Sequence, residues 1–96
     1  MKIKSCTYQS SEPWGPLVKK DLNEKIESFI LSLNKGQDTI LGFLQSFTFP
    51  EKFADEHAED MANSLYDIYR KHQSVLLGGD TSGGPSLVIT VVALLK

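Results

Sequence analysis

The chain has 96 residues, of which 41% are apolar and 23% are charged, and its formal net charge is −2. This length predicts a single domain, residues 1–96, with a modest core, and the composition excludes a largely disordered chain. The acidic balance and the scattered Lys and Arg residues argue against nucleic-acid binding, which requires clustered positive charge.

The sequence has no feature of an exported or membrane-inserted protein. Cys6 is the single cysteine, so no internal disulfide can form. No apolar run of a signal peptide follows the first residues. The C-terminal apolar run, residues 87–95, is shorter than the roughly 20 residues that a helix needs to cross a bilayer. We therefore expect a cytoplasmic protein.

The first half of the chain predicts a strand and then a helix. Residues 2–8 are tolerant of β structure, and the segment 10–16, with two prolines and a glycine, ends this strand. Pro16 suits the first turn of a helix, and Gly36 suits its end. Between them, apolar residues recur every three or four positions: Leu17, Val18, Leu22, Ile26, Phe29, Ile30 and Leu33.

Residues 38–50 fit two structures. Leu41, Phe43, Phe47 and Phe49 share one parity, as the residues on one face of a strand do. A helix that begins after Asp38 also fits the apolar spacing. The flanking glycine and proline residues favour the strand.

The second half predicts another helix and a last strand. Residues 53–72 begin with acidic side chains and end with basic ones, which complements a helix macrodipole. A glycine-rich loop, residues 78–85, then leads into the β-branched strand 86–96. The expected order is therefore β-α-β-α-β, an α+β fold in which a small sheet carries two helices on one face.

The glycine-rich loop is the first candidate site. Glycines let backbone N–H groups turn toward an anion, and hydroxyl side chains add donors. A phosphate-binding loop normally opens a helix and not a strand, and this one contains no lysine. A P-loop is therefore not expected, and two interpretations remain: a mobile loop in solvent, or contact with a small ligand of nucleotide type. The residues assigned to this contact are Gly79, Asp80, Thr81, Ser82 and Gly83.

Three aromatic or cationic residues complete the predicted ligand site. Trp14 stands between Pro13 and Gly15, a setting that suits either an anchor for a ligand or a cover over the edge of the core. Tyr69 and Arg70, at the end of the second helix, can stack on a ring. Packing of the tyrosine in the core is the alternative.

Catalytic and metal-binding patterns are weak in this sequence. The string from Gly79 to Pro85 is similar to the serine-protease string Gly-Asp-Ser-Gly-Gly-Pro, but an inserted Thr81 breaks it. His57 and His72 lie fifteen residues apart, about 22 Å along one helix, and cannot share an ion within one subunit. We predict no catalytic residues, no metal and no cofactor.

The segment Lys20–Phe29, followed by a strand and by a last apolar strand that ends at Lys96, resembles short sporulation-associated and phage-encoded proteins of Gram-positive bacteria. The resemblance covers residues 1–49 and 86–96. The helix 53–72 and the glycine-rich loop depart from it. It implies a bacterial or phage origin and no particular chemistry.

The last strand is apolar on both faces, which a chain of this size covers with difficulty. An exposed apolar strand invites pairing, so we predict a homo-oligomer formed through the C-terminal strand, with Leu87, Ile89 and Val91 as interface residues. The predicted function is a non-catalytic binding or regulatory protein that sequesters or blocks a partner. One alternative is a phage anti-defence sponge that holds a nucleotide signal between subunits, and the other is a small enzyme with a histidine and an acidic neighbour.

Overall fold

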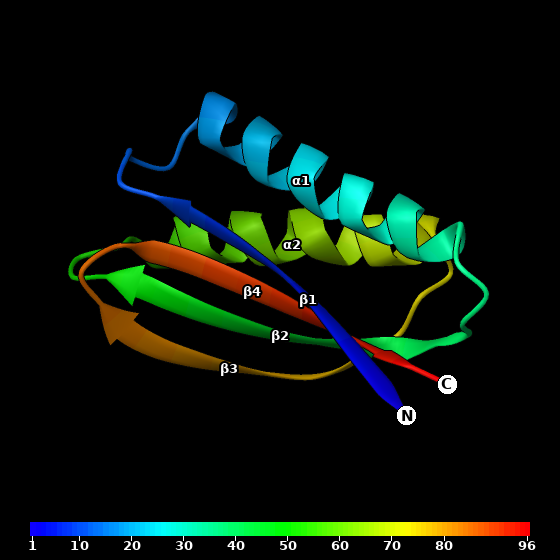
Figure 1. The fold of residues 1–96 in the computed structure, drawn as a ribbon. Helices are drawn as coiled ribbons and strands as arrows, with labels where there is room; N and C mark the ends of the chain where they lie inside the picture. Colours follow the sequence, from blue (N-terminus) through cyan, green and yellow to red (C-terminus); the bar gives the residue numbers. More distant parts are fainter.

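A computed structural model describes residues 1–96 as one mixed sheet with two helices on the same face (Figure 1). Neither helix has both the length and the apolar character that crossing a bilayer requires. The elements are β1 (Lys2–Ser10), α1 (Pro16–Asn34), β2 (Ile40–Pro50), α2 (Asp55–Lys71), β3 (Leu76–Gly84) and β4 (Leu87–Leu95).

The predicted α+β fold is confirmed, with one strand more than expected. Residues 40–50 form a strand, as the parity of the phenylalanines indicated, and not a helix. Residues 76–84, predicted to end in a glycine-rich loop, form strand β3. Glycine disfavours strands because it contributes no side-chain packing. Here β3 is held by its parallel ladder to β2, which runs from Phe43–Leu76 to Pro50–Gly84.

The strand order is β1-β4-β2-β3. The last strand of the chain therefore lies in the interior of the sheet, antiparallel to β1 on one side and to β2 on the other. Strand β3 precedes β4 in the sequence but lies beyond β2, so the short connection Pro85–Ser86 passes the end of β2. The free edges of the sheet belong to β1 and β3.

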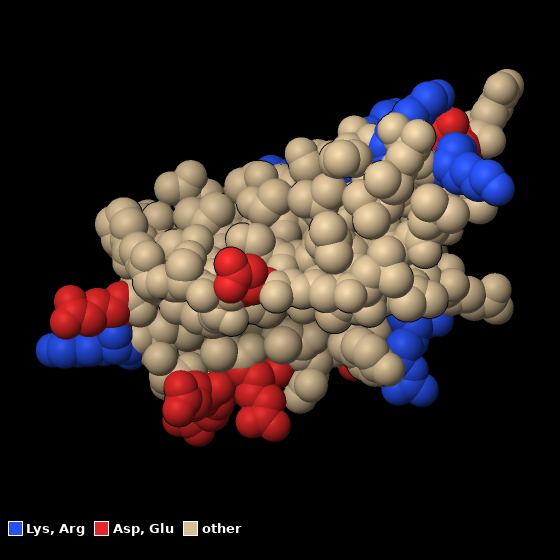
Figure 2. All heavy atoms as spheres, turned by 90° about the horizontal axis from the view of Figure 1, so that it is seen from below, with Lys and Arg blue, Asp and Glu red and all other residues tan.

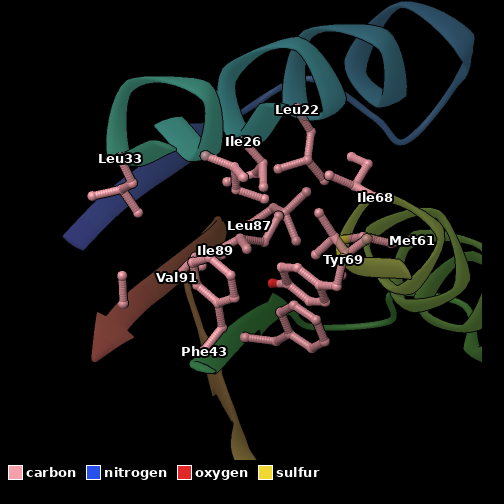
Figure 3. Close-up of a cluster of buried hydrophobic side chains, with 14 of the residues drawn as sticks. Leu22, Ile26, Leu33, Phe43, Met61, Ile68, Tyr69, Leu87, Ile89 and Val91 are labelled. Atoms are coloured by element: carbon pink, nitrogen blue, oxygen red, sulfur yellow. The ribbon is translucent and has the colours of Figure 1, made fainter. Parts of the chain in front are cut away.

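The core lies between the helices and the sheet (Figure 3). On β4, Leu87, Ile89 and Val91 are 0–2% exposed and point toward the helices. The predicted role of these three residues as an interface is therefore corrected: they are core residues. They are covered because the helices contribute their own apolar faces, which include Leu22, Ile26, Met61 and Leu65.

Candidate functional site

The face of the sheet away from the helices has no cover in this structure; we call it the open face. It is formed by the residues that alternate with the core residues, such as Val88, Thr90 and Val92 on β4. Figure 2 looks onto this side of the molecule and shows Lys, Arg, Asp and Glu gathered at the rim, with one acidic group inside an uncharged expanse.

Polar side chains cross the open face in two rows, which we call the hydroxyl rows. The strand register places the first row on Thr7, Thr90, Ser46 and Asp80, and the second on Gln9, Val88, Thr48 and Ser82. The hydroxyl oxygens of Thr7 and Thr90 lie 3.1 Å apart, and those of Thr48 and Ser82 lie 3.3 Å apart. The first row is polar on all four strands, whereas Val88 interrupts the second, and both rows end on β3 with a polar residue, Asp80 or Ser82.

Asp80 is the charged residue of these rows. Its Oδ1 accepts a hydrogen bond from the backbone N–H of Thr81 at 2.8 Å. Its carboxylate forms no ion pair, although five ion pairs exist elsewhere in the chain. An exposed carboxylate without a cationic partner, beside hydroxyl groups, is suited to a hydrated divalent cation.

The predicted glycine-site residues are divided between the two sides of β3. Asp80 and Ser82 share the open face with Ser46 and Thr48, whereas Gly79, Thr81 and Gly83 are in register with Gln45, Phe47 and Phe49 on the helix side. A Cβ on Gly79 would lie 2.7 Å from the backbone oxygen of Gln45, so this position accepts only glycine without a shift of the strands.

Trp14 is half-buried and fixed in place at the start of α1. Its Nε1 donates to Asp60 Oδ2 at 3.1 Å, and Lys19 Nζ donates to Asp60 Oδ1 at 2.8 Å. The hydrogen bond from Lys19 and then that from Trp14 hold the pKa of Asp60 below its ordinary value. Asp60 therefore ties the loop before α1 to helix α2.

Trp14 lies on the walls of two hollows. One, about 580 Å³, runs along β1 and the start of α1, and its walls include Tyr8, Glu12 and Asp21. The other, about 220 Å³, lies at the end of the sheet, where Pro85 and Ser86 connect β3 to β4. The structure thus brings Trp14 close to the end of the glycine strand.

The remaining two predicted ligand residues lie elsewhere. Tyr69 is 1% exposed; its ring stacks on Phe43 with centroids 5.2 Å apart, and its hydroxyl donates to Gln45 Oε1 at 2.9 Å. Burial raises the pKa of Tyr69 above its ordinary value. Arg70 is exposed and lies over the ring of Tyr66, 5.7 Å from its centroid. Ten residues of helix, about 15 Å, separate Arg70 from Asp60, which binds Trp14.

The histidines also lie apart. His57 packs edge-on against Phe53, with ring centroids 5.9 Å apart. His72 Nε2 lies 2.8 Å from Glu27 Oε1, which also accepts a 2.8 Å hydrogen bond from Lys71 Nζ. The hydrogen bonds from Lys71 and then His72 lower the pKa of Glu27. This cluster joins α1 to the end of α2.

The hydroxyl rows do not follow from the residue spacing within any one strand. The available signal was Thr90 inside an otherwise apolar strand, and Ser46 and Thr48 at the parity opposite to the phenylalanines of β2. These residues come from separate parts of the chain. Their alignment across strands depends on register, which the spacing within one strand does not specify.

No protein-family model matches the sequence, and no curated protein matches it. The predicted resemblance to sporulation-associated and phage-encoded proteins thus stays a prediction.

The fold is similar to parts of solved proteins. Thiamine monophosphate kinase from Aquifex aeolicus matches with a TM-score of 0.79 at 12% sequence identity, over 95% of this chain and 32% of that one. AaThiL complexed with AMPPCP and TMP matches with a TM-score of 0.80 at 12% identity, over 97% of this chain and 31% of that one. Hydrogenase maturation protein HypE in complex with ATP matches with a TM-score of 0.77 at 12% identity, over 98% of this chain and 29% of that one.

These similarities correct the predicted function. A non-catalytic binding or regulatory protein, including one that sequesters a nucleotide signal, is contradicted by neighbours that are kinases or an ATP-bound maturation protein. The chain spans about a third of the length of these proteins. Nearly all of it therefore has the fold of one part of thiamine monophosphate kinase and of HypE.

Proposed function

We propose that this chain is the nucleotide-binding part of an ATP-dependent enzyme. The observation that carries the proposal is the shared fold: 97–98% of the chain aligns with proteins solved with AMPPCP or with ATP. AMPPCP is an analogue of ATP, so both neighbours hold a nucleoside triphosphate or its mimic. The chemistry of β3 supports the same assignment.

Strand β3 has the groups that a triphosphate with its cation requires. Mg²⁺ in proteins that use ATP is typically held by one or two carboxylates together with phosphate oxygens and waters. Asp80 supplies one unpaired carboxylate, and Ser82 and Thr48 supply hydroxyl donors beside it. Gly78 and Gly84 flank these residues on β3 without side chains of their own, and the side chain of Thr48 lies over Gly84. The positive charge next to the phosphates would then come from the cation, since the hydroxyl rows contain no Lys or Arg.

Titration calorimetry with Mg-ATP tests this assignment. We expect saturable binding that is lost when Mg²⁺ is removed and is weakened about tenfold or more, about 1.4 kcal/mol or more, by Asp80→Asn. The matched control is Asp67→Asn, an exposed carboxylate on α2 outside the open face. Absence of saturable binding at millimolar Mg-ATP contradicts the proposal, as does an equal loss in both variants.

We also propose that a second copy of the chain covers part of the open face. Exposed apolar side chains gather on it at the end opposite the hydroxyl rows, with Ile3 at 64%, Leu44 at 38% and Leu77 at 51% exposure. Four strands of about nine residues span about 30 Å by 19 Å, a flat area smaller than the roughly 800 Å² per partner of a standard interface, so the contact is expected at the small end of the range. Two copies that meet at the apolar end of this face leave the unpaired carboxylate of Asp80 outside the contact and so bury no unpaired charge.

Size-exclusion chromatography with light scattering measures the molar mass in solution and so tests the proposed dimer. We expect a dimer at micromolar concentration that Val92→Lys converts to a monomer, because the substitution places a charge in the middle of the open face. The control is Ile68→Val in the core, which leaves this face unchanged. A strict monomer at micromolar concentration, or a dimer unaffected by Val92→Lys, contradicts the proposal.

A further inference from the structure

The smaller hollow beside Trp14 lies where four separate segments meet at one end of the sheet. Its volume is about 220 Å³. The segments are the end of β1 with the following loop, the end of β2, the turn into α2, and the connection from β3 to β4. The residues that matter most for its chemistry are Ser10, Glu12, Trp14, Phe53, Pro85 and Ser86. We call this space the end hollow.

The walls of the end hollow combine flat apolar groups with hydrogen-bonding groups. Trp14 and Phe53 supply aromatic rings, and Pro85 supplies an apolar ring from the opposite segment. Ser10, Ser86 and Glu12 supply hydroxyl and carboxylate oxygens. A heterocyclic base needs this combination, because its faces stack on rings while its edge exchanges hydrogen bonds.

The aromatic walls are held in position before any ligand binds. Trp14 is fixed by its hydrogen bond to Asp60, which also binds Lys19. The ring of Phe53 stacks on Phe49, with centroids 5.0 Å apart. Side chains that are already ordered lose little conformational entropy on binding, so their contacts contribute more to affinity.

The end hollow is also in reach of the proposed phosphate site. Five residues of extended chain, about 16 Å, separate Asp80 from Pro85. Gly83 and Gly84 are two of the four residues between them; nothing lies within 4 Å of a Cβ on Gly83, whereas the side chain of Thr48 lies over Gly84. Asp80 is on the open face and the walls Phe53 and Leu87 are on the helix side, so a ligand that joins the two places passes around the end of the sheet. An extended nucleoside triphosphate can bridge this interval.

From this arrangement we propose that the end hollow binds the purine base of the nucleotide whose phosphates lie at Asp80. The inference rests on the proposed function, because it specifies the second half of the same ligand. It assigns Trp14 and Phe53 to stacking on the base, and Glu12 with the serine hydroxyls to its polar edge.

The emission of Trp14 tests the inference in the unmodified protein. Trp14 is the single tryptophan of the chain, and it lines both the end hollow and the larger hollow along β1, so a change in its emission is assigned to the end hollow only if Phe53→Leu, at a wall of the end hollow alone, also weakens binding. We expect Mg-ATP to change the intensity or wavelength of the emission in step with binding measured by calorimetry. Magnesium tripolyphosphate, which has no base, should bind more weakly and leave the emission unchanged.

The affinities of variants with altered walls of the end hollow provide a second test. Trp14→Leu should weaken Mg-ATP binding about tenfold or more, the range expected for loss of one stacking contact, while tripolyphosphate binding stays the same. Phe53→Leu should act in the same direction and leaves the hydrogen bond to Asp60 intact. The matched control is Tyr66→Leu, which removes an exposed aromatic ring of α2 outside the hollow.

The outcomes separate the two proposals. If neither Mg-ATP nor tripolyphosphate binds, the proposed function itself fails. If Mg-ATP binds but the emission of Trp14 does not change, the proposed function stands and the base site is wrong. Equal affinities for Mg-ATP and tripolyphosphate, or a Phe53→Leu variant that binds Mg-ATP as well as the unmodified protein, also overturn the base site.

Discussion

Ile89→Ala is expected to lower the free energy of unfolding by about 2–5 kcal/mol. Ile89 is 0% exposed on the interior strand β4 and belongs to the cluster of 16 buried residues. Its truncation removes apolar contacts and leaves a cavity, because its neighbours in the core, which include Tyr8 on β1 and Phe47 on β2, cannot all move to fill it. A domain of this kind has only about 5–15 kcal/mol in total. Urea unfolding followed by the fluorescence of Trp14 measures the change.

Two adjacent valines provide the control for this prediction. Val91 is 0% exposed and faces the helices, whereas Val92 is half-buried on the open face. Measured at one low protein concentration, Val91→Ala should cost about 2 kcal/mol, and Val92→Ala clearly less. Equal costs for the two valines, or a negligible cost for Ile89→Ala, would show that the helices do not cover β4 as the structure has them.

Gly79→Ala is the second substitution with a large expected effect. The added Cβ would lie 2.7 Å from the backbone oxygen of Gln45, in the strand that pairs with β3. Backbone cannot rotate aside as a flexible side chain does, so the β2–β3 ladder has to shift. We expect a loss of about 1–3 kcal/mol, the usual cost of overpacking. Thermal unfolding measures it, with each kcal/mol worth roughly 4–8 °C in a domain of this size.

Gly83→Ala is the matched control on the same strand and the same side of the sheet. A Cβ there meets nothing within 4 Å. Since alanine also restricts the unfolded chain, the stability should stay the same or rise by about 0.4–1 kcal/mol. If the two glycine variants lose the same stability, the close approach of β3 to β2 is not the reason for glycine at position 79.

The two helices and strand β2, which follow from the spacing of apolar residues, were predicted correctly. Both helices follow from apolar residues three and four apart, and their observed bounds, Pro16–Asn34 and Asp55–Lys71, lie within a few residues of the expected ones. The strand Ile40–Pro50 follows from the parity of its phenylalanines. These are local properties, because they depend on which side chains share a face of one helix or one strand.

Strand β3 was missed for a physical reason. Its sequence, Leu-Leu-Gly-Gly-Asp-Thr-Ser-Gly-Gly, lacks the side chains that normally stabilise a strand. It becomes one because β2 pairs with it in a parallel ladder that is regular from Leu44–Gly78 to Pro50–Gly84. With β3 as a strand, Asp80 moves from a loop into a row of hydroxyl groups, which changes the chemistry that this carboxylate can take part in.

The candidate site was predicted in part. Gly79, Asp80, Thr81, Ser82, Gly83 and Trp14 were named from their residue types, and the structure places Trp14 near one end of the strand that carries the others. The helical spacing left Tyr69 either in the core or on the ligand, and its contacts with Phe43 and Gln45 place it in the core.

The two faces of β4 separate what the amino-acid sequence determines from what the tertiary structure determines. The sequence establishes that this strand is apolar on both sides, because its residue types are the same in any fold. Which side becomes the core, and whether the strand lies at an edge or inside the sheet, depends on contacts with helices and strands far away in the chain. Those contacts put Ile89 under the helices and Val92 on the open face. They also place Asp80 and the hydroxyl rows on the open face, and the end hollow at the end of the same sheet.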